Sequence, residues 1–348
     1  MSLCVPLHLR ESARPGRVAA LMEFGFTLRQ ARFLAHVLVY SGVFLERQYR
    51  TFAGIAHGQK THDFLAKLVN DGYARAITPG ALHRGRLFHV QYKPLYEAIG
   101  EPNNRNRKPA SLGRFVERLM LLDAVLADRQ YGWLGTERDK MNYFVAYLEK
   151  DLSKEWYPHL TFGEGQEKTA RYFPDKLPIG TPRDGGRRHV FLYLVTREVP
   201  AEFRMFLLRH AELFRSVDEW TVRLLVPRRF RKAAALYRYA VRDELASPVH
   251  PSTVEELEWF FRERHGRPQR SPRHPDLDPD LNLATASQKF DAARFRSLEK
   301  MWLQEGYRAV GAAQSPVLRD RLHKGYARIE FVELSHQYLQ LTPLVGVA

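Results

Sequence analysis

The stretch QKTHDFLAKLVNDG, residues 59–72, decides the fold of the N-terminal region. Its apolar residues recur at the spacing of one helical face and predict a helix over residues 59–70. The Asn-Asp-Gly that follows ends this helix, because glycine accepts the backbone conformation needed after a last turn. The opposite, polar face carries Gln59, Lys60, His62, Asp63 and Lys67.

Two further helices are predicted before this one. In residues 27–41, TLRQARFLAHVLVYS, Thr27 can act as the N-cap, a wide apolar face follows, and Gly42 ends the helix. Residues 45–53 form a shorter helix with Tyr49 and Phe52 turned inward. The N-terminal region therefore begins with three helices.

A hairpin is predicted after the third helix. Residues 73–78 and 86–92 alternate as two strands joined by PGALHRG. Three helices followed by a hairpin is the order of a winged helix-turn-helix, in which one helix enters the major groove and hairpin cations contact phosphates. The predicted DNA contacts are Gln59, Lys60, His62 and Lys67 on the helix and Arg84 and Arg86 on the hairpin.

The charge of the chain supports a polyanionic partner. The 348 residues carry a formal net charge of +15, and residues 1–110 hold 16 basic and 7 acidic residues. More than half of the excess therefore lies in the first third of the chain. Nucleic acid, and double-stranded DNA first, is the partner expected from this balance.

The sequence also narrows the location of the protein. The single cysteine, Cys4, excludes an intramolecular disulfide framework and a cysteine-based zinc cluster. No signal peptide and no membrane-spanning segment is recognisable. We expect a cytoplasmic protein associated with the nucleoid and no membrane partner. No metal-binding helix, P-loop or dinucleotide motif is present, so no cofactor is expected.

Two polar, proline-containing stretches divide the chain. EPNNRNRKP at residues 101–109 and GRPQRSPRHPDLDPD at residues 266–280 interrupt regular structure. The predicted domains are a winged helix over 1–100, an α/β domain over 112–265 and a helical segment with a terminal strand over 284–348. Residues 101–111 and 266–283 are the linkers between them.

The middle domain combines helices and strands. A helix is predicted over 112–128, followed by strands and helices that are typical of an α/β sandwich. The predicted elements are strands at 159–162, 189–196 and 219–227 and helices at 201–215 and 229–245. The fold class of the whole chain is therefore α+β.

The C-terminal segment contains a long amphipathic helix, predicted over 287–312, and an edge strand over 327–334. The apolar face of the helix packs within the chain or against another protein or a second subunit.

The densest cationic run of the chain is RRFRK at residues 228–232, at the start of the helix predicted over 229–245. Cations at a helix N-terminus oppose the helix dipole, so a bound anion would offset this cost. Phosphate contacts by Arg228, Arg229, Arg231 and Lys232 are one interpretation. An ordinary solvated face is the other.

These patterns together resemble the replication-relaxation proteins of bacterial plasmids and integrated mobile elements. The resemblance covers residues 27–245 and rests on two sets of motifs. They are Leu28-Arg-Gln-Ala-Arg32, Phe64-Leu-Ala-Lys-Leu68 and Gly72-Tyr73, and then Phe173-Pro-Asp175 and the strand from Val190 to Thr196. It implies a DNA-binding module joined to a domain like a restriction endonuclease.

Active nucleases of that fold bind Mg²⁺ through an aspartate after proline and a Glu-x-Lys on the next strand. Only Asp175 matches this pattern, because the strand from Phe191 to Val195 is wholly apolar. A single carboxylate holds a hard cation weakly. The favoured hypothesis is therefore a non-enzymatic DNA-binding protein of a mobile element or plasmid that controls replication, transfer or transcription.

Two alternatives stay open. The first is a metal-dependent nuclease that uses Asp175 and Mg²⁺, with further ligands among Glu149, Glu155 and Glu164. The second is a protein-interaction adaptor that uses a winged helix for protein contacts.

Overall fold

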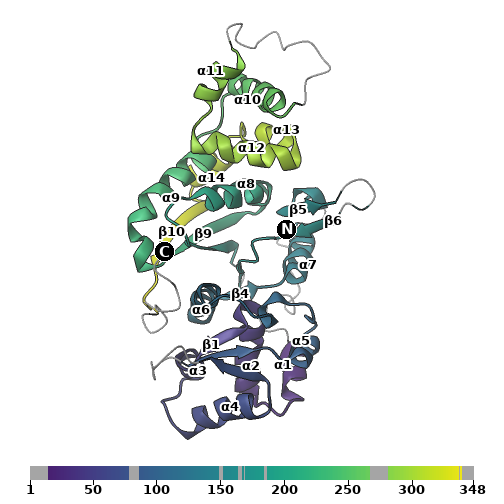
Figure 1. Ribbon diagram of the computed structural model, residues 1–348, viewed down its shortest axis with the longest axis vertical. Coiled ribbons are helices and arrows are strands. Elements are labelled where there is room, and N and C mark those ends of the chain that lie inside the picture. Colours follow the sequence, from purple (N-terminus) through teal and green to yellow (C-terminus); the bar gives the residue numbers. More distant parts are fainter. Residues whose placement is uncertain are drawn as a thin grey trace. The chain divides into compact units, whose positions relative to one another are not determined.

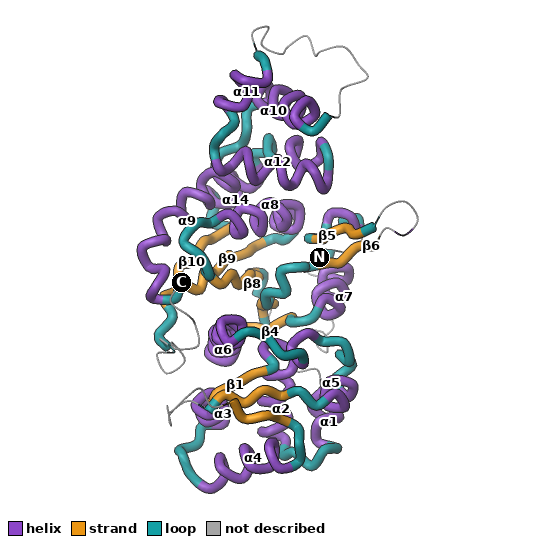
Figure 2. The backbone as a smooth tube through the Cα atoms, in the orientation of Figure 1, coloured by secondary structure: helices purple, strands orange, loops and turns teal. Residues whose placement is uncertain are grey.

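The computed structural model describes residues 15–77, 86–148, 152–163, 167, 169–183, 186–266, 281–336 and 338. The chain forms two compact units. Unit 1 comprises residues 1–147, 176–196 and 333–348, and unit 2 comprises residues 148–175 and 197–332. Both units mix helices with short strands, which confirms the α+β class (Figures 1 and 2).

Unit 1 begins with α1 (Pro15–Met22) and α2 (Leu28–His36), and a π-helical turn (Val37–Ser41) continues α2. Thr27 caps α2 as predicted, since its hydroxyl accepts from the Gln30 amide while the Gln30 side chain accepts from the Thr27 amide. Gly42 ends the helix with a φ of 73°. A Cβ at this position would lie 2.3 Å from the Asn106 carbonyl oxygen, so only glycine is accommodated.

The next two helices match the prediction closely. They are α3 (Glu46–Ala53) and α4 (Gln59–Asn70). Their inner faces meet α2 through aromatic rings, because the centre of the Phe33 ring in α2 lies 5.1 Å from that of Tyr49 and 6.4 Å from that of Phe64. The Tyr49 and Phe64 centres are themselves 4.3 Å apart. These packed rings fix the three helices as one core.

A three-stranded antiparallel sheet accompanies the helices, in the order β1 (Val43–Leu45), β3 (Leu87–Val90) and β2 (Ala74–Ile77). Val43 pairs with His89, and Ala74 pairs with Val90. The two strands predicted at 73–78 and 86–92 are confirmed as β2 and β3. The sequence did not predict β1, because three residues are too few for a period-2 pattern.

The segment expected as a linker over 101–111 is packed instead. After α5 (Lys93–Ala98) it forms a 3₁₀ turn (Arg105–Arg107), in which Asn106 is buried. The Asn106 side-chain amide donates to the carbonyl oxygens of Leu38 and Val39, at 3.2 and 3.0 Å. The segment therefore completes the hydrogen bonding of the end of α2, and α6 (Leu112–Ala127) belongs to unit 1 rather than opening a second domain.

The remainder of unit 1 is an antiparallel set of strands with one helix. The strands are β4 (Tyr131–Leu134), β7 (Ile179–Pro182) and β8 (Arg188–Leu194), and α7 (Glu137–Tyr147) follows β4. The apolar strand predicted at 189–196 is β8, and all its residues after the first are buried. Arg17 of α1 is tied to Asp139 of α7 by a buried ion pair of 2.9 Å.

Unit 2 contains a hairpin, a strand pair and most of the remaining helices. The hairpin is β5 (His159–Phe162) with β6 (Thr169–Tyr172), and the strand pair is β9 (Glu219–Val226) with β10 (Ala327–Glu333) at a sheet edge. Helix α8 (Ala201–Ser216) precedes β9. After β9 come a 3₁₀ turn (Arg228–Ala233), α9 (Ala234–Val241) and a π turn (Arg242–Ala246).

The C-terminal helices of unit 2 have a core of their own. They are α10 (Pro251–Arg264), α11 (Leu283–Lys289), α12 (Ala293–Glu305), α13 (Tyr307–Ala312) and α14 (Val317–His323). Buried Phe260, Phe290 and Trp302 belong to that core, to which α10, α11, α12 and α13 contribute. Helix α14 packs against α8 and the π turn instead. The single long helix predicted over 287–312 is wrong, because the chain bends after Lys289 and again at Gly306, where φ is 66°.

Candidate nucleic-acid interface

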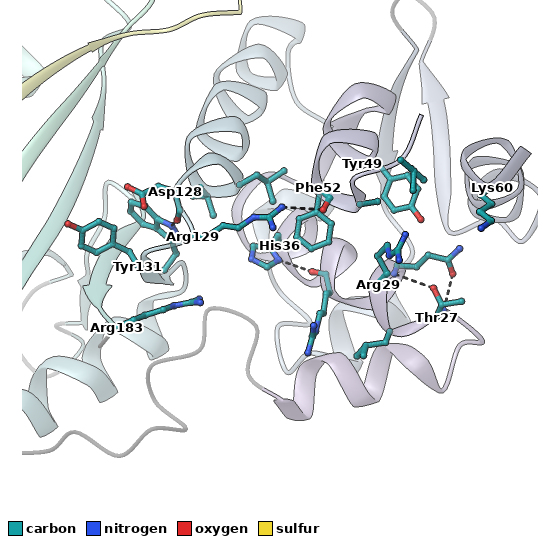
Figure 3. A pocket seen from close by; sticks show the side chains of 18 of the residues that line it. Thr27, Arg29, His36, Tyr49, Phe52, Lys60, Asp128, Arg129, Tyr131 and Arg183 are labelled. Atoms are coloured by element: carbon teal, nitrogen blue, oxygen red, sulfur yellow. Dashed lines mark hydrogen bonds between the residues drawn. The ribbon is translucent and has the colours of Figure 1, made fainter. Parts of the chain in front are cut away.

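A solvent-open groove of about 1050 Å³ runs across unit 1. Its walls come from α2, the end of α3, the start of α4, the C-terminal end of α6, β4 and Arg183. Figure 3 shows Arg29 and Lys60 toward one end, Arg129 and Arg183 toward the other, and His36 and Phe52 between them. We call this feature the basic groove.

Cations outnumber carboxylates in the basic groove. The basic side chains in its lining are Arg29, Arg32, Lys60, Arg129 and Arg183. The acidic ones are Asp63, which accepts from the Gln59 amide, and Asp128, which accepts from the Gln130 backbone amide at 3.2 Å. The lining therefore carries a surplus of three positive charges, spread from end to end.

Two arginines of the groove stand on the exposed face of α2. Arg29 and Arg32 are three residues apart and so share one side of the helix. Arg129 is held more firmly, because its Nη2 donates to the Phe52 carbonyl oxygen at 3.3 Å and its guanidinium lies 5.8 Å from the centre of the Phe52 ring. The groove thus combines the exposed Arg29 and Arg32 with Arg129, whose side chain is held by Phe52.

The pKa of His36 is lowered by its surroundings in the groove. Its Nδ1 lies 2.7 Å from the Arg32 carbonyl oxygen. Burial lowers the pKa of the His36 imidazole below its usual range, and the positive charges of Arg183 and Arg129 lower it further. Burial disfavours a charge of either sign, so only the contribution of Arg183 and Arg129 shows that this part of the groove is positive.

Aromatic side chains form the apolar part of the lining. Tyr49 and Trp133 are buried, whereas Phe52 and Tyr131 are half-buried. The Trp133 indole donates to the Asp128 carbonyl oxygen at 3.0 Å, which fixes the turn before β4. Cations beside accessible rings are compatible with a nucleic-acid strand, because cations can contact its phosphates and apolar rings can pack against its sugars.

The predicted contacts on α4 differ from one another in the structure. Lys60 and His62 are exposed, and Lys60 lines the groove. Gln59 donates to Asp63 one turn further along. Lys67, expected on the free polar face, is half-buried, and its Nζ donates to the Gly25 carbonyl oxygen at 2.7 Å and lies 4.8 Å from the Phe26 ring centre. The polar face of α4 is therefore less cationic than predicted.

The predicted hairpin contacts are described only in part. Arg84 lies outside the described residues, while Arg86 is exposed just before β3. Arg75, on the neighbouring strand β2, is also exposed and pairs in register with His89. Arg75 was missed as a candidate, because alternation along residues 73–78 places it on the same face as the apolar Tyr73 and Ile77.

The other predicted residues lie in unit 2. Arg228, Arg229, Arg231 and Lys232 occupy the 3₁₀ turn after β9. Asp175 forms an ion pair of 3.0 Å with Arg209 of α8, and its other oxygen lies 4.0 Å from the His210 Nδ1. Its carboxylate is thus already matched by a cation.

The ligands suggested for a nuclease do not gather in the described part of the chain, where no group of three His, Cys, Asp or Glu side chains could hold a metal ion. Glu149 and Glu164 lie outside the described residues, and Glu155 accepts a hydrogen bond from the Ser153 hydroxyl.

Comparison with known proteins adds no relative, since no family model, no curated protein and no solved structure matches the chain. Among the described helices, none is long and apolar enough to cross a membrane.

Proposed function

We propose that the protein binds double-stranded DNA through unit 1, which acts as a winged helix-turn-helix without catalysing a reaction. The element order α2, β1, α3, α4, β2, β3 and the sheet order β1, β3, β2 support this proposal. In such a module α4 enters the major groove, and the β2–β3 hairpin is the wing.

The observation that carries the proposal is the row of cations in the basic groove. Lys60, at the start of α4, belongs to both the helix and the groove. A helix in the major groove is flanked by phosphates, so cations that continue outward from its N-terminus lie where a DNA backbone passes. Arg29, Arg32, Arg129 and Arg183 continue this row along the basic groove, away from the start of α4.

The roles of the groove and of α4 differ. Gln59 and His62 on the exposed face of α4 are the candidates for contacts with base edges, because amide and imidazole groups both donate and accept hydrogen bonds. The arginines of the groove, together with Arg86 on the wing, contact phosphates and set the affinity for any sequence. A protein of this kind serves replication, transfer or transcription of a mobile element or plasmid. A genome-wide map of bound DNA in the host separates these roles.

The test neutralises two groove cations without disturbing the fold. Arg29→Ala/Arg32→Ala replaces exposed positions of α2 with the best helix former, so the stability of unit 1 is retained. We expect the double variant to bind a duplex at least tenfold more weakly than the wild type, as measured by fluorescence anisotropy. The matched control is Lys93→Ala/Arg114→Ala, which removes two exposed cations paired with Glu97 and Glu117 outside the groove.

The control is expected to bind within twofold of the wild type. Equal affinities of the Arg29→Ala/Arg32→Ala variant and the control would overturn the proposal.

A further inference from the structure

We propose that the outer face of residues 228–242 in unit 2 binds single-stranded nucleic acid. This is a second binding surface, and it does not rest on the duplex binding proposed for unit 1. It comprises the 3₁₀ turn, α9 and the first residue of the π turn. We call it the α9 face.

One side of this segment is fixed to the body of unit 2. Tyr237 is buried, its hydroxyl donates to the Arg197 carbonyl oxygen at 3.0 Å, and its ring centre lies 5.3 Å from that of Phe203 in α8. Ala233 and Ala240 are buried on the same side. The opposite side is exposed and carries Arg229, Lys232, Leu236, Arg238, Tyr239 and Arg242.

The charge of the segment is wholly positive. Residues 228–242 contain six basic and no acidic residues. The next two residues, Asp243 and Glu244, are carboxylates, but both are bound by Arg204 of α8, at 2.7 and 2.6 Å. The nearest negative charges in the sequence are therefore already paired with Arg204, and the Glu244 side chain is also buried.

The outer arginines lie over aromatic rings rather than beside carboxylates in the described part of the chain. The Arg229 guanidinium is 4.5 Å from the centre of the Phe230 ring, and that of Arg242 is 4.6 Å from the Tyr239 ring. An arginine stacked on a ring keeps donors at its edge for a phosphate.

The exposed apolar side chains favour a single strand over a duplex. Tyr239 is 53% exposed and Leu236 is 47% exposed, both among the cations. A duplex presents phosphates to a convex surface and keeps its base faces stacked, so these two side chains would find no partner. A single strand offers both phosphates and unstacked bases, and bases stack on exposed rings regardless of sequence.

The test measures a single-stranded thymidine 20-mer and a duplex of the same length in parallel. All chains carry Arg29→Ala/Arg32→Ala, so that any strand held by the basic groove does not mask the second surface. Lys232→Ala/Arg242→Ala should weaken binding of the 20-mer at least tenfold and binding of the duplex less than threefold. The matched control Lys300→Ala/Lys324→Ala removes two exposed cations of unit 2 outside this face and should change neither.

The ring contribution has its own variants. Tyr239→Ala should weaken binding of the single strand about tenfold, because a stacked base is lost, whereas Tyr239→Phe keeps the ring and should bind within twofold of its parent. Should Lys232→Ala/Arg242→Ala fail to fold, Lys232→Gln/Arg242→Gln retains longer side chains and the same change of charge.

Three outcomes would overturn the inference. Equal losses for the 20-mer and the duplex would identify a contact with the DNA backbone only. Binding of the 20-mer that matches the control would remove nucleic acid as the partner of this face. Unchanged binding of the 20-mer together with lost binding to phosphatidylserine vesicles would assign the face to a membrane surface.

Discussion

Single side chains separate the cations that hold the fold from those that face solvent. Lys60 and Lys67 share α4 and have the same charge, yet only Lys60 is exposed. Lys67 instead joins α4 to the turn before α2 through the Gly25 carbonyl oxygen and the Phe26 ring. Sequence periodicity placed both on one polar face, because it does not record a long side chain that reaches back to the backbone.

This difference predicts opposite effects of two alanine variants. Lys67→Ala should lower the free energy of unfolding by about 1 kcal/mol, since one hydrogen bond and one cation–π contact are lost, and should change duplex affinity less than threefold. Lys60→Ala should leave stability within about 0.5 kcal/mol and weaken duplex binding at least threefold. Thermal unfolding and anisotropy measure the two effects. Lys67→Ala with an unchanged melting temperature would contradict this assignment.

His36 predicts a pH dependence of stability. Its pKa is lowered in the folded state, so below about pH 6.5 the unfolded chain binds a proton that the folded chain does not. Stability contributed by the neutral imidazole is therefore present above pH 6.5 and lost as the pH falls below it. Relative to His36→Gln, the wild type should lose stability as the pH falls from 7.5 to 5.5 in urea unfolding.

Because His89 and all other titrating groups are common to both chains, they cancel in this comparison. The same pH dependence in the wild type and in His36→Gln would show that His36 is protonated equally in both states.

At the level of elements, helices with strong end signals were predictable. For α4 the predicted bounds are those observed, and for α2 the cap at Thr27 and the stop at Gly42 are confirmed. In both, an apolar stripe is bracketed by residues whose backbone or side chain ends a helix, and these signals act over a few neighbouring residues.

The elements that were predicted wrongly depend on contacts far away in the sequence. The apolar pattern of residues 287–312 continues through the bend at Gly306, so periodicity alone reads α12 and α13 as one helix. Residues 101–111 look like a linker because they are polar. The side-chain amide of Asn106, however, donates hydrogen bonds to the carbonyl oxygens of Leu38 and Val39 at the end of α2, which would otherwise lack a partner.

The basic groove could be predicted only in part for the same reason. Lys60 was recognised from the face of α4, but Arg29, Arg32, Arg129 and Arg183 come from three other parts of the chain. None belongs to a cationic run such as residues 228–232. These four arginines become neighbours only when α2, the end of α6 and the segment after β7 are folded into one unit.

For the whole molecule, the uneven distribution of charge predicts how affinity responds to salt. Each phosphate neutralised by a lysine or arginine releases condensed counterion, which contributes about −0.9 to the slope of the logarithm of the binding constant against the logarithm of salt concentration. The groove offers five cations. If each of these cations and Arg86 of the wing meets one phosphate, the slope for duplex DNA should be about −5.4, and Arg29→Ala/Arg32→Ala should reduce it to about −3.6.

A salt titration of duplex binding checks this prediction, with Lys93→Ala/Arg114→Ala expected to retain the wild-type slope. The affinity loss in the Arg29→Ala/Arg32→Ala variant should also shrink as salt rises, because the lost free energy is mostly that of counterion release. A wild-type slope near zero would mean that phosphates contribute little, and duplex DNA would then not be the ligand of unit 1. An unchanged slope in the groove variant would place the phosphate contacts elsewhere on unit 1.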